Sequence, residues 1–222
     1  DGAADADGLT LPPPARPPRV RPRLARITAV ACGDSHTVVQ TEDGCVWTFG
    51  WGRDGELGHG DGLNRRVPTL VLPEHFGNKK VVFVAAGAGH SAAASEEGHV
   101  FTWGCGLNGR LGHGYSVSYA SPHEVTTLPS IAKVVEVACG CEHTLVRTYD
   151  GSVLSWGNGD RGQLGTTDNY HGVGINVHYK PQAVFALKRY FVLQISAGRW
   201  HNAVLTSDRS VYVWGAGHFG QL

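Results

Sequence analysis

One pattern recurs four times along the 222 residues and constrains the fold more than any other feature. Each copy has a histidine, an acidic residue seven positions later, an aromatic residue after thirteen and a leucine after twenty-one. Successive histidines are 54, 53 and 58 residues apart, and glycine always follows the aromatic residue. The histidines are His36, His90, His143 and His201, and the aromatic residues are Phe49, Trp103, Trp156 and Trp214. A repeat of this length predicts one supersecondary unit per copy, stacked on its neighbours.

The residues between these landmarks predict four short strands per copy. Runs rich in β-branched and aromatic residues lead into each histidine, and a second run continues from it. Asp43-Gly44 and Asp150-Gly151 predict two-residue hairpin turns, after which a third strand returns antiparallel. A fourth strand is expected to begin at a proline, where no ladder donor is lost. These prolines are Pro68, Pro122 and Pro181. Four antiparallel strands per repeat are typical of the blades of a β-propeller.

The third copy carries the clearest family signature. It combines Cys-Gly-x-x-His-Thr at 139–144 with Trp-Gly-x-Gly-x-x-Gly-x-Leu-Gly at 156–165. This signature resembles the repeat of the regulator of chromosome condensation family, and the resemblance covers residues 26–222. It lacks the Trp-Asp pair and the Gly-Gly pair of two other propeller classes. The resemblance implies an all-β propeller with four-stranded blades, of which this chain holds about three and a half of seven.

Two regions are expected along the chain. Residues 1–25 contain a proline- and arginine-rich tract, which predicts an extended linker or arm without a core. Residues 26–222 hold the repeats, with blade units at 26–76, 77–130, 131–188 and 189–222, the last incomplete. Either the native chain continues beyond Leu222, or two copies close one ring as a homodimer. Continuation is the favoured alternative, because an open blade edge leaves backbone groups unpaired.

The balance of charge and the cysteine content limit the partners and the compartment. Lysine plus arginine equals aspartate plus glutamate at 19 each, so no general attraction to nucleic acid or to an acidic membrane is expected. Nucleic acid is expected only at the arginine-rich arm 16–26, whose alternatives are a linker or a nuclear-import signal. No apolar run is long enough to span a bilayer, so no membrane partner is expected. Five cysteines without CxxC spacing favour an intracellular location, cytoplasmic or nuclear.

The sequence supplies no recognisable catalytic or metal-binding group. The repeat histidines belong to different blades and cannot share an ion, so we expect each ring to hydrogen-bond to nearby backbone. Gly157-x-Gly159-x-x-Gly162 matches the dinucleotide-binding pattern in letters, but it recurs in every unit without a following helix. We therefore expect no catalytic residue, no cofactor, no metal and no enzymatic activity.

Candidate binding residues lie where the repeats differ, because loops on the faces of a propeller vary with function. The third unit has an insertion at 166–180, and the first unit has a polar loop after its aromatic residue. The candidates are Asn169, Tyr170, His171 and Tyr179 in the insertion, and Arg53, Arg65 and Arg66 in the first loop. The alternative for both segments is a solvated loop. The predicted function is a protein-interaction or regulatory module that binds a protein partner through its face loops.

Two further functions are implied by the resemblance. The namesake of the family exchanges guanine nucleotide on a small nuclear Ran-type GTPase and associates with chromatin, using a wedge inserted after one aromatic–glycine pair. All four units here keep the ordinary glycine turn at that point, although further blades could carry such a wedge. A function like that of the plant ultraviolet-B photoreceptor needs several tryptophans directly before the repeat histidines. Only Trp200 occupies such a position.

Overall fold

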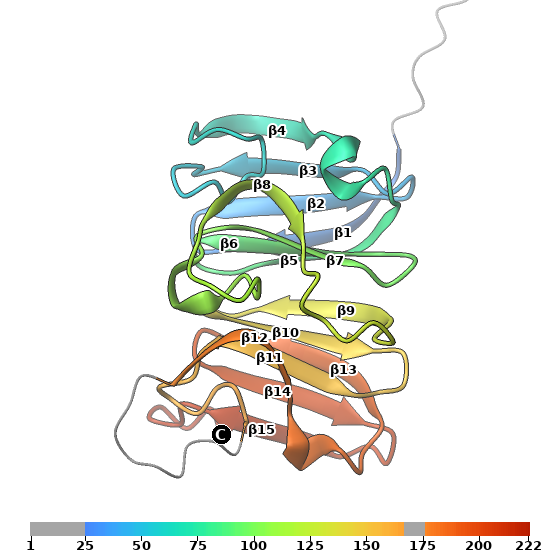
Figure 1. Ribbon diagram of the computed structural model, residues 1–222, viewed down its shortest axis with the longest axis vertical. Helices are drawn as coiled ribbons and strands as arrows, with labels where there is room; N and C mark the ends of the chain where they lie inside the picture. The colour runs from blue at the N-terminus through green and yellow to red at the C-terminus, as the bar shows by residue number, and fades with distance from the viewer. Residues whose placement is uncertain (1–24, 167–175) are drawn as a thin grey trace, which may run out of the picture.

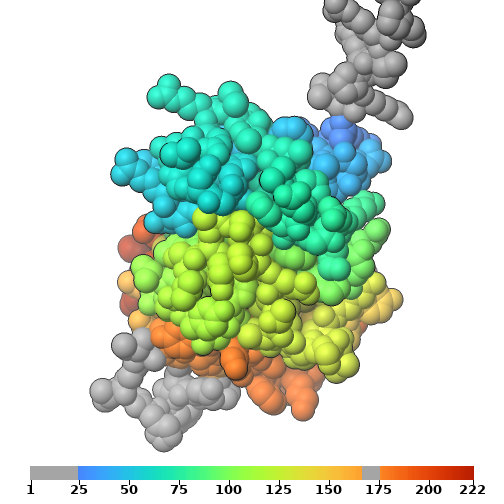
Figure 2. All heavy atoms as spheres, turned by 45° about the horizontal axis from the view of Figure 1, so that its top comes forward, coloured from blue at the N-terminus to red at the C-terminus, as the bar shows by residue number. Residues whose placement is uncertain are grey.

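The computed structural model describes residues 25–166 and 176–222, which form a succession of antiparallel sheets. Three sheets have four strands each and the last has three, in the order in which the strands occur along the chain. Figure 1 shows these blades stacked from the first at the top to the fourth at the bottom. In Figure 2 the first three blades follow one another as contiguous bands of atoms. The predicted all-β propeller with four-stranded blades is confirmed.

The strand bounds are as follows. The first blade contains β1 (Ile27–Cys32), β2 (His36–Thr41), β3 (Val46–Gly50) and β4 (Arg65–Val71). The second contains β5 (Val81–Ala86), β6 (His90–Ser95), β7 (Val100–Gly104) and β8 (Tyr119–Glu124). The third contains β9 (Val134–Cys139), β10 (His143–Thr148), β11 (Val153–Asn158) and β12 (Val177–Ala183). The fourth contains β13 (Val192–Ala197), β14 (His201–Thr206) and β15 (Val211–Gly215). Short 3-10 helices are η1 (Pro73–Phe76), η2 (Leu107–Gly109) and η4 (Phe185–Leu187).

The core lies between blades rather than within them. Every residue of β6 and β7 is buried, because blades on both sides cover the second sheet. In β14 buried and partly exposed residues alternate, as expected where one face of a sheet is covered. Phe76 of η1 packs edge-to-face on Phe101 and Trp103 of β7, with ring centroids 5.4 and 5.8 Å apart. Each blade thus depends on its neighbour for burial of apolar surface.

The predicted two-residue hairpin turns are wrong, because the loops have three residues. In the first blade Gly44 N donates to Thr41 O at 2.8 Å, and Thr41 N donates to Cys45 O at 3.0 Å. This is a β-turn followed by a left-handed residue, which a three-residue hairpin requires. Gly44 has a φ of 84°, and Arg209 in the fourth blade adopts 68° at the same position. The glycine that follows the acidic residue in three repeats is therefore explained by this conformation.

The prolines lie inside the outermost strands rather than at their starts, which corrects the expected strand bounds. Pro68 is in β4, Pro122 is in β8 and Pro181 is in β12. The pairing of β3 with β4 shifts register between Thr48 and Gly50, opposite the segment that contains Pro68. An outer strand with a bulge tolerates a residue that has no N–H, and such a residue also blocks pairing with another strand.

Candidate protein-interaction surface

The two ends of the blades form two different surfaces, which are on the left and the right in Figure 1. We call the first the loop face; it carries the glycine-rich loops 51–64, 105–118, 159–166 and 216–222 and the turns before the repeat histidines. The second is the turn face; it carries the hairpin loops 42–44, 96–98, 149–151 and 207–209 and the linkers between blades, 72–80, 125–133 and 184–191. Within the part of the chain that the structure describes, no helix is long and apolar enough to cross a membrane.

A chain of hydrogen bonds crosses each described interface between blades. Between the second and third blades, His90 Nε2 lies 2.9 Å from Thr144 Oγ1, and this hydroxyl donates to Arg110 O at 2.8 Å. Trp156 Nε1 donates to the same carbonyl at 2.9 Å. Because the hydroxyl proton is used on Arg110 O, His90 must donate from Nε2, which assigns its neutral tautomer. The same arrangement joins His36, Ser91, Glu56 and Trp103, and also His143, Asn202, Gln163 and Trp214.

These contacts correct the expected partner of the histidines. The ring nitrogen contacts a side chain of the next blade instead of nearby backbone, because the residue after each repeat histidine lies across the interface. Burial lowers the pKa of His36 and of His143 to about 4, and lowers the pKa of His90 well below its ordinary value. All three rings are therefore neutral at neutral pH. Over residues 25–166 and 176–222, no three His, Cys, Asp or Glu side chains are placed to hold a metal ion.

The arginines of the first loop lie on or beside the loop face of the first blade. The Arg53 guanidinium stacks 4.9 Å from the centre of the exposed Trp51 ring. Arg65 forms an ion pair with Asp61, Nη2 to Oδ2, at 2.8 Å. Arg66 is exposed in β4. Arg53 and Arg66 are thus available to a partner, whereas the charge of Arg65 is partly neutralised.

The candidates of the third unit are only partly described. Asn169, Tyr170 and His171 lie outside the described residues. Tyr179 is 42% exposed in β12, and a Cβ on Gly109 would lie 2.8 Å from its ring, so the ring packs on the loop of the second blade. The whole second blade separates Tyr179 from the three arginines. The structure therefore places these candidates in two separate groups instead of one site.

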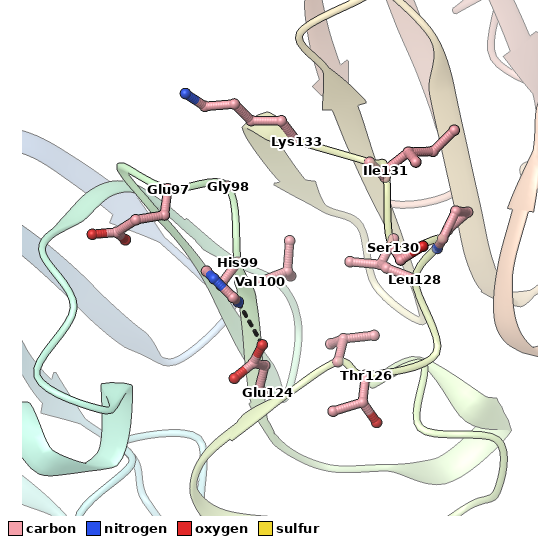
Figure 3. A pocket seen from close by; sticks show the side chains of 13 residues that line it. Glu97, Gly98, His99, Val100, Glu124, Thr126, Leu128, Ser130, Ile131 and Lys133 are labelled. Atoms are coloured by element: carbon pink, nitrogen blue, oxygen red, sulfur yellow. Dashed lines mark hydrogen bonds and ion pairs between the residues drawn. The ribbon is translucent and has the colours of Figure 1, made fainter.

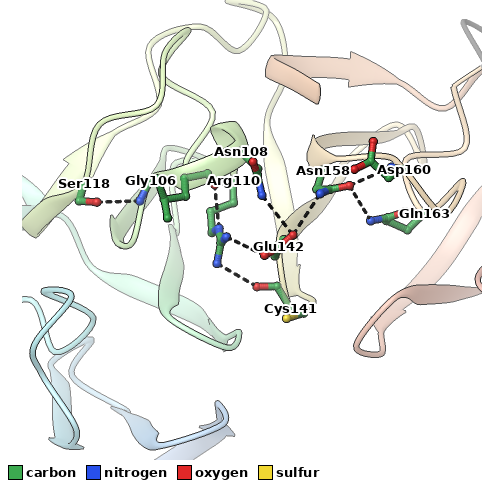
Figure 4. Close-up of polar contacts among 10 residues, drawn as sticks. Gly106, Asn108, Arg110, Ser118, Cys141, Glu142, Asn158, Asp160 and Gln163 are labelled. Carbon is green, nitrogen blue, oxygen red and sulfur yellow. Dashed lines mark hydrogen bonds and ion pairs between the residues drawn. The ribbon is translucent and has the colours of Figure 1, made fainter. Parts of the chain in front are cut away.

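A polar network that the sequence did not predict joins the loops of the second and third blades (Figure 4). Arg110 is almost fully buried, and its Nη2 lies 3.2 Å from Glu142 Oε1. Arg110 also donates to Cys141 O at 3.2 Å. Glu142 Oε2 accepts hydrogen bonds from Asn108 at 3.2 Å and Asn158 at 3.0 Å. The network fixes adjacent loops on the loop face by charge-assisted hydrogen bonds.

A departure from the repeat could have revealed this network. Twenty positions after the repeat histidine, the other units have Glu56, Gln163 and Gln221. Each of those side chains accepts a hydrogen bond from the backbone N–H two residues earlier in its own loop. Arg110 cannot accept this hydrogen bond; its Nε donates to Leu107 O in its own loop at 2.9 Å, and its terminal nitrogens contact the next blade. A second Arg–Trp stack, Arg161 at 5.0 Å from the Trp200 ring, was also not predicted.

A rim groove of about 380 Å³ lies beside the second blade (Figure 3). His99 Nδ1 lies 2.6 Å from Glu124 Oε1 on one wall, and Leu128 and Ile131 belong to the linker that forms the other wall. Its lining combines acidic, basic and apolar side chains. Both side chains of this contact are about 40% exposed, so it contributes little to stability.

Comparison with known proteins agrees with this architecture. The family model described as "RCC1-like domain" matches residues 2–222. The chain is 38% identical over 197 residues to the ultraviolet-B receptor UVR8 of Arabidopsis thaliana, covering 89% of this chain and 43% of that protein. It is 36% identical over 215 residues to the human E3 ubiquitin-protein ligase HERC2, covering 96% of this chain and 4% of that protein.

Solved structures give the same result. Prp20p from Saccharomyces cerevisiae superposes with a TM-score of 0.73 at 28% identity, over 88% of this chain and 45% of Prp20p. Human WBSCR16 superposes with a TM-score of 0.77 at 28% identity, over 88% of this chain and half of WBSCR16. The chain thus spans half or less of each of these relatives. Its repeats, its blades and the match over almost all its residues show that it belongs to the family of RCC1-like domain proteins.

Proposed function

We propose that this propeller is a non-catalytic interaction module that binds a protein partner on its loop face. Its relatives include an ultraviolet-B receptor and an E3 ubiquitin-protein ligase, each at least 36% identical to it over most of this chain. A common scaffold with different functions is expected when function resides in the loops.

The Arg110–Glu142 network is the observation that carries this proposal. It immobilises the loops of two blades before any partner binds, so less conformational entropy is lost on binding. The stack of Arg53 on Trp51 lies on the first blade, and the stack of Arg161 on Trp200 joins the third and fourth blades. Arginine and tryptophan are enriched among the residues that dominate binding energy at protein interfaces.

The state of the reactive side chains supports a non-catalytic role. The histidines His36, His90 and His143 are buried in the interfaces between blades, where they serve the hydrogen-bond chains. Burial raises the pKa of the Cys139 thiol to about 12, so this cysteine stays protonated at neutral pH and is a poor nucleophile.

Exchange of guanine nucleotide on a small GTPase is the second candidate. Prp20p supports it, because its structure was described together with binding to Gsp1p and histones. In this chain the loop after each aromatic–glycine pair closes with the same bond between glycines, as in Gly55 N to Gly52 O at 3.0 Å. The equivalent bonds are Gly109 N to Gly106 O, Gly162 N to Gly159 O and Gly220 N to Gly217 O. The described loops therefore offer no inserted wedge, and the interaction module is the better-supported proposal.

Charge reversal on the loop face tests the proposal. The double variant Arg53→Glu/Arg161→Glu changes two exposed side chains, and Glu42→Ala/Glu74→Ala is the matched control on the turn face. Proteins that copurify with the full chain are quantified by mass spectrometry, and direct binding of each purified protein is then measured. We expect the loop-face variant to lose at least about tenfold in affinity for a direct partner, and the control to retain it. Equal binding by both variants would contradict the proposal.

A further inference from the structure

The turn face differs between the first and the last junction of blades, and the repeat itself shows how. The buried Phe76 and Val81 of the first junction correspond to Leu187 and Val192 of the last, which aligns the two linkers position by position. Four charged positions of the first junction are aromatic in the last one. They are Glu42, Glu74, Lys79 and Lys80 in the first, and Tyr149, Phe185, Tyr190 and Phe191 in the last.

Folding does not require aromatic residues at three of these positions. Tyr149 is 73% exposed, Phe185 is 62% exposed and Phe191 is 45% exposed. The first junction carries charged residues there and still forms the same strands and linker helix. Ile131, which is 92% exposed, adds a further apolar side chain in the preceding linker. Exposed apolar residues that gather in one place, and that the fold does not need, mark a surface for binding.

The aromatic side chains and the preceding linker are joined by direct contacts. A Cβ on Gly151 would lie 2.7 Å from the Phe191 ring, so this ring packs on the hairpin loop that contains Tyr149. Tyr149 N donates to Lys133 O at 2.8 Å, which connects this loop to the linker that contains Ile131. Phe185 and Tyr190 lie at the two ends of the linker segment built around η4, near the bottom of Figure 1.

Two unpaired cations lie beside these rings. Lys188 and Arg189 are exposed, and neither has an ion pair within residues 25–166 and 176–222. Lys188 lies 5.7 Å from the Phe185 ring and Arg189 lies 5.3 Å from the Tyr190 ring.

The nearby carboxylates are held by hydrogen bonds within their own hairpin loops. Asp150 accepts hydrogen bonds from Thr148 Oγ1 and Ser152 N, and Asp208 accepts them from Thr206 and Ser210. In the first junction, by contrast, Lys80 is 3.8 Å from Glu96, so cation and anion are paired there. The unpaired cations of the last junction complement an acidic partner.

We propose that this aromatic and basic patch on the turn face, formed by Tyr149, Phe185, Tyr190, Phe191, Lys188 and Arg189, is a docking surface for an acidic protein segment that carries aliphatic or aromatic side chains. The apolar side chains of the segment pack on the exposed rings, and its carboxylates pair with Lys188 and Arg189. The patch is at the opposite end of the blades from the loop face. This surface is therefore independent of the partner proposed for the loop face.

A defined probe tests this surface with the full chain. The probe is a fluorescein-labelled peptide in which pairs of glutamates alternate with leucine or phenylalanine, and binding is measured by fluorescence anisotropy. One comparison peptide has lysine in place of glutamate, and another has serine in place of the apolar residues. We expect the probe to bind and both comparison peptides to bind at least about tenfold more weakly. Failure of the probe to bind, or equal binding of all three peptides, would overturn the proposal.

The repeat provides matched variants. Tyr149→Glu/Phe185→Glu/Phe191→Lys introduces the residues of the first junction, and Glu42→Ala/Glu74→Ala/Lys80→Ala changes that junction instead. Tyr190 is left unchanged because its ring packs on Tyr212 at 4.7 Å. We expect the first variant to weaken probe binding at least about tenfold with an unchanged circular dichroism spectrum and melting temperature, and the second to bind normally.

Two controls separate this surface from the loop face and from a membrane-binding site. Arg53→Glu/Arg161→Glu on the loop face should bind the probe as the unmodified chain does, so the two proposals can fail separately. Vesicles of phosphatidylserine and phosphatidylcholine test whether an anionic membrane is the occupant. Vesicle binding that the Tyr149→Glu/Phe185→Glu/Phe191→Lys variant abolishes, without binding of the peptide probe, would overturn the proposal in favour of a membrane.

Discussion

The first and last junctions between blades share the same buried contacts, whereas their exposed residues on the turn face differ. Inside, His36 contacts Ser91 and His143 contacts Asn202, and each of these partners donates to a carbonyl that also accepts from an indole N–H. Outside, the charged residues of the first junction become aromatic in the last. The comparison separates residues that build the propeller from residues that the propeller merely displays. A side chain that changes while the contacts beneath it stay the same is a candidate for binding.

The largest expected effect is inside, at Trp103. This side chain is fully buried against Phe76 and donates to Glu56 O at 2.9 Å. Trp103→Ala should lower the free energy of unfolding by about 3 to 5 kcal/mol, measured by urea denaturation. Trp103→Phe retains most of the packing but loses the indole bond, and should cost about 1 kcal/mol. A loss below about 1 kcal/mol for the alanine variant would show that the interface does not depend on this ring.

Acid should weaken the same interior contacts. Because the pKa of His36 and of His143 is about 4 in the folded chain and 6.5 in the unfolded chain, the unfolded chain takes up protons first as the pH falls. The free energy of unfolding is therefore highest above pH 6.5, and it decreases as the pH falls toward 4. Between pH 7 and pH 5, each of these two histidines should lower the free energy of unfolding by about 2 kcal/mol. Denaturation at the two pH values measures this difference.

A glutamine variant isolates one of these histidines. The side-chain amide of His143→Gln can donate to Asn202 but cannot take up a proton in this range. The difference between pH 7 and pH 5 should therefore shrink by about 2 kcal/mol in this variant. An unchanged difference would mean that His143 does not titrate below its ordinary pKa in the folded chain.

Sequence spacing predicted the blades because every blade needs the same number of residues between its repeat histidine and its aromatic residue. The run of residues from one histidine to its aromatic partner has one length, so the four copies align by residue type and spacing alone. The partner of each histidine could not be predicted from the spacing, because Ser91 and Asn202 lie across an interface that only the folded chain forms. The three-residue hairpins and the internal prolines depend on local backbone geometry, to which residue patterns are less sensitive.

The candidate surface was less predictable than the fold. Arg53 was identified by the polarity of its loop, but its stacking on Trp51 was not. Arg110 was missed because a glycine-rich loop with one arginine resembles an ordinary solvated turn. Its departure from the Glu or Gln of the other units was visible in the sequence. Differences between aligned repeats are therefore more informative about function than the polarity of any one loop.

Substitution of Arg110 should change the free energy of unfolding by less than the interior substitutions do. Arg110→Gln introduces the residue that the third blade has at this position and removes the contact with Glu142. Because Glu142 keeps Asn108 and Asn158 as donors, we expect a loss of about 1 kcal/mol in unfolding free energy. The double variant Arg110→Gln/Glu142→Gln should recover part of this loss, since no partly buried carboxylate is then left without its cation. A double variant less stable than Arg110→Gln would contradict this role of the network.

The smallest effect on stability is expected at the exposed surface of the last junction between blades. Phe185→Glu exchanges an exposed ring for the residue that Glu74 supplies at the same position of the first junction. Because the buried Leu187 of the same linker is untouched, the unfolding free energy should change by less than about 0.5 kcal/mol. Leu187→Ala is the matched interior change and should cost about 2 to 5 kcal/mol. Equal losses for the two variants would show that Phe185 is part of the fold, and the distinction between the inside and the outside of this junction would then be lost.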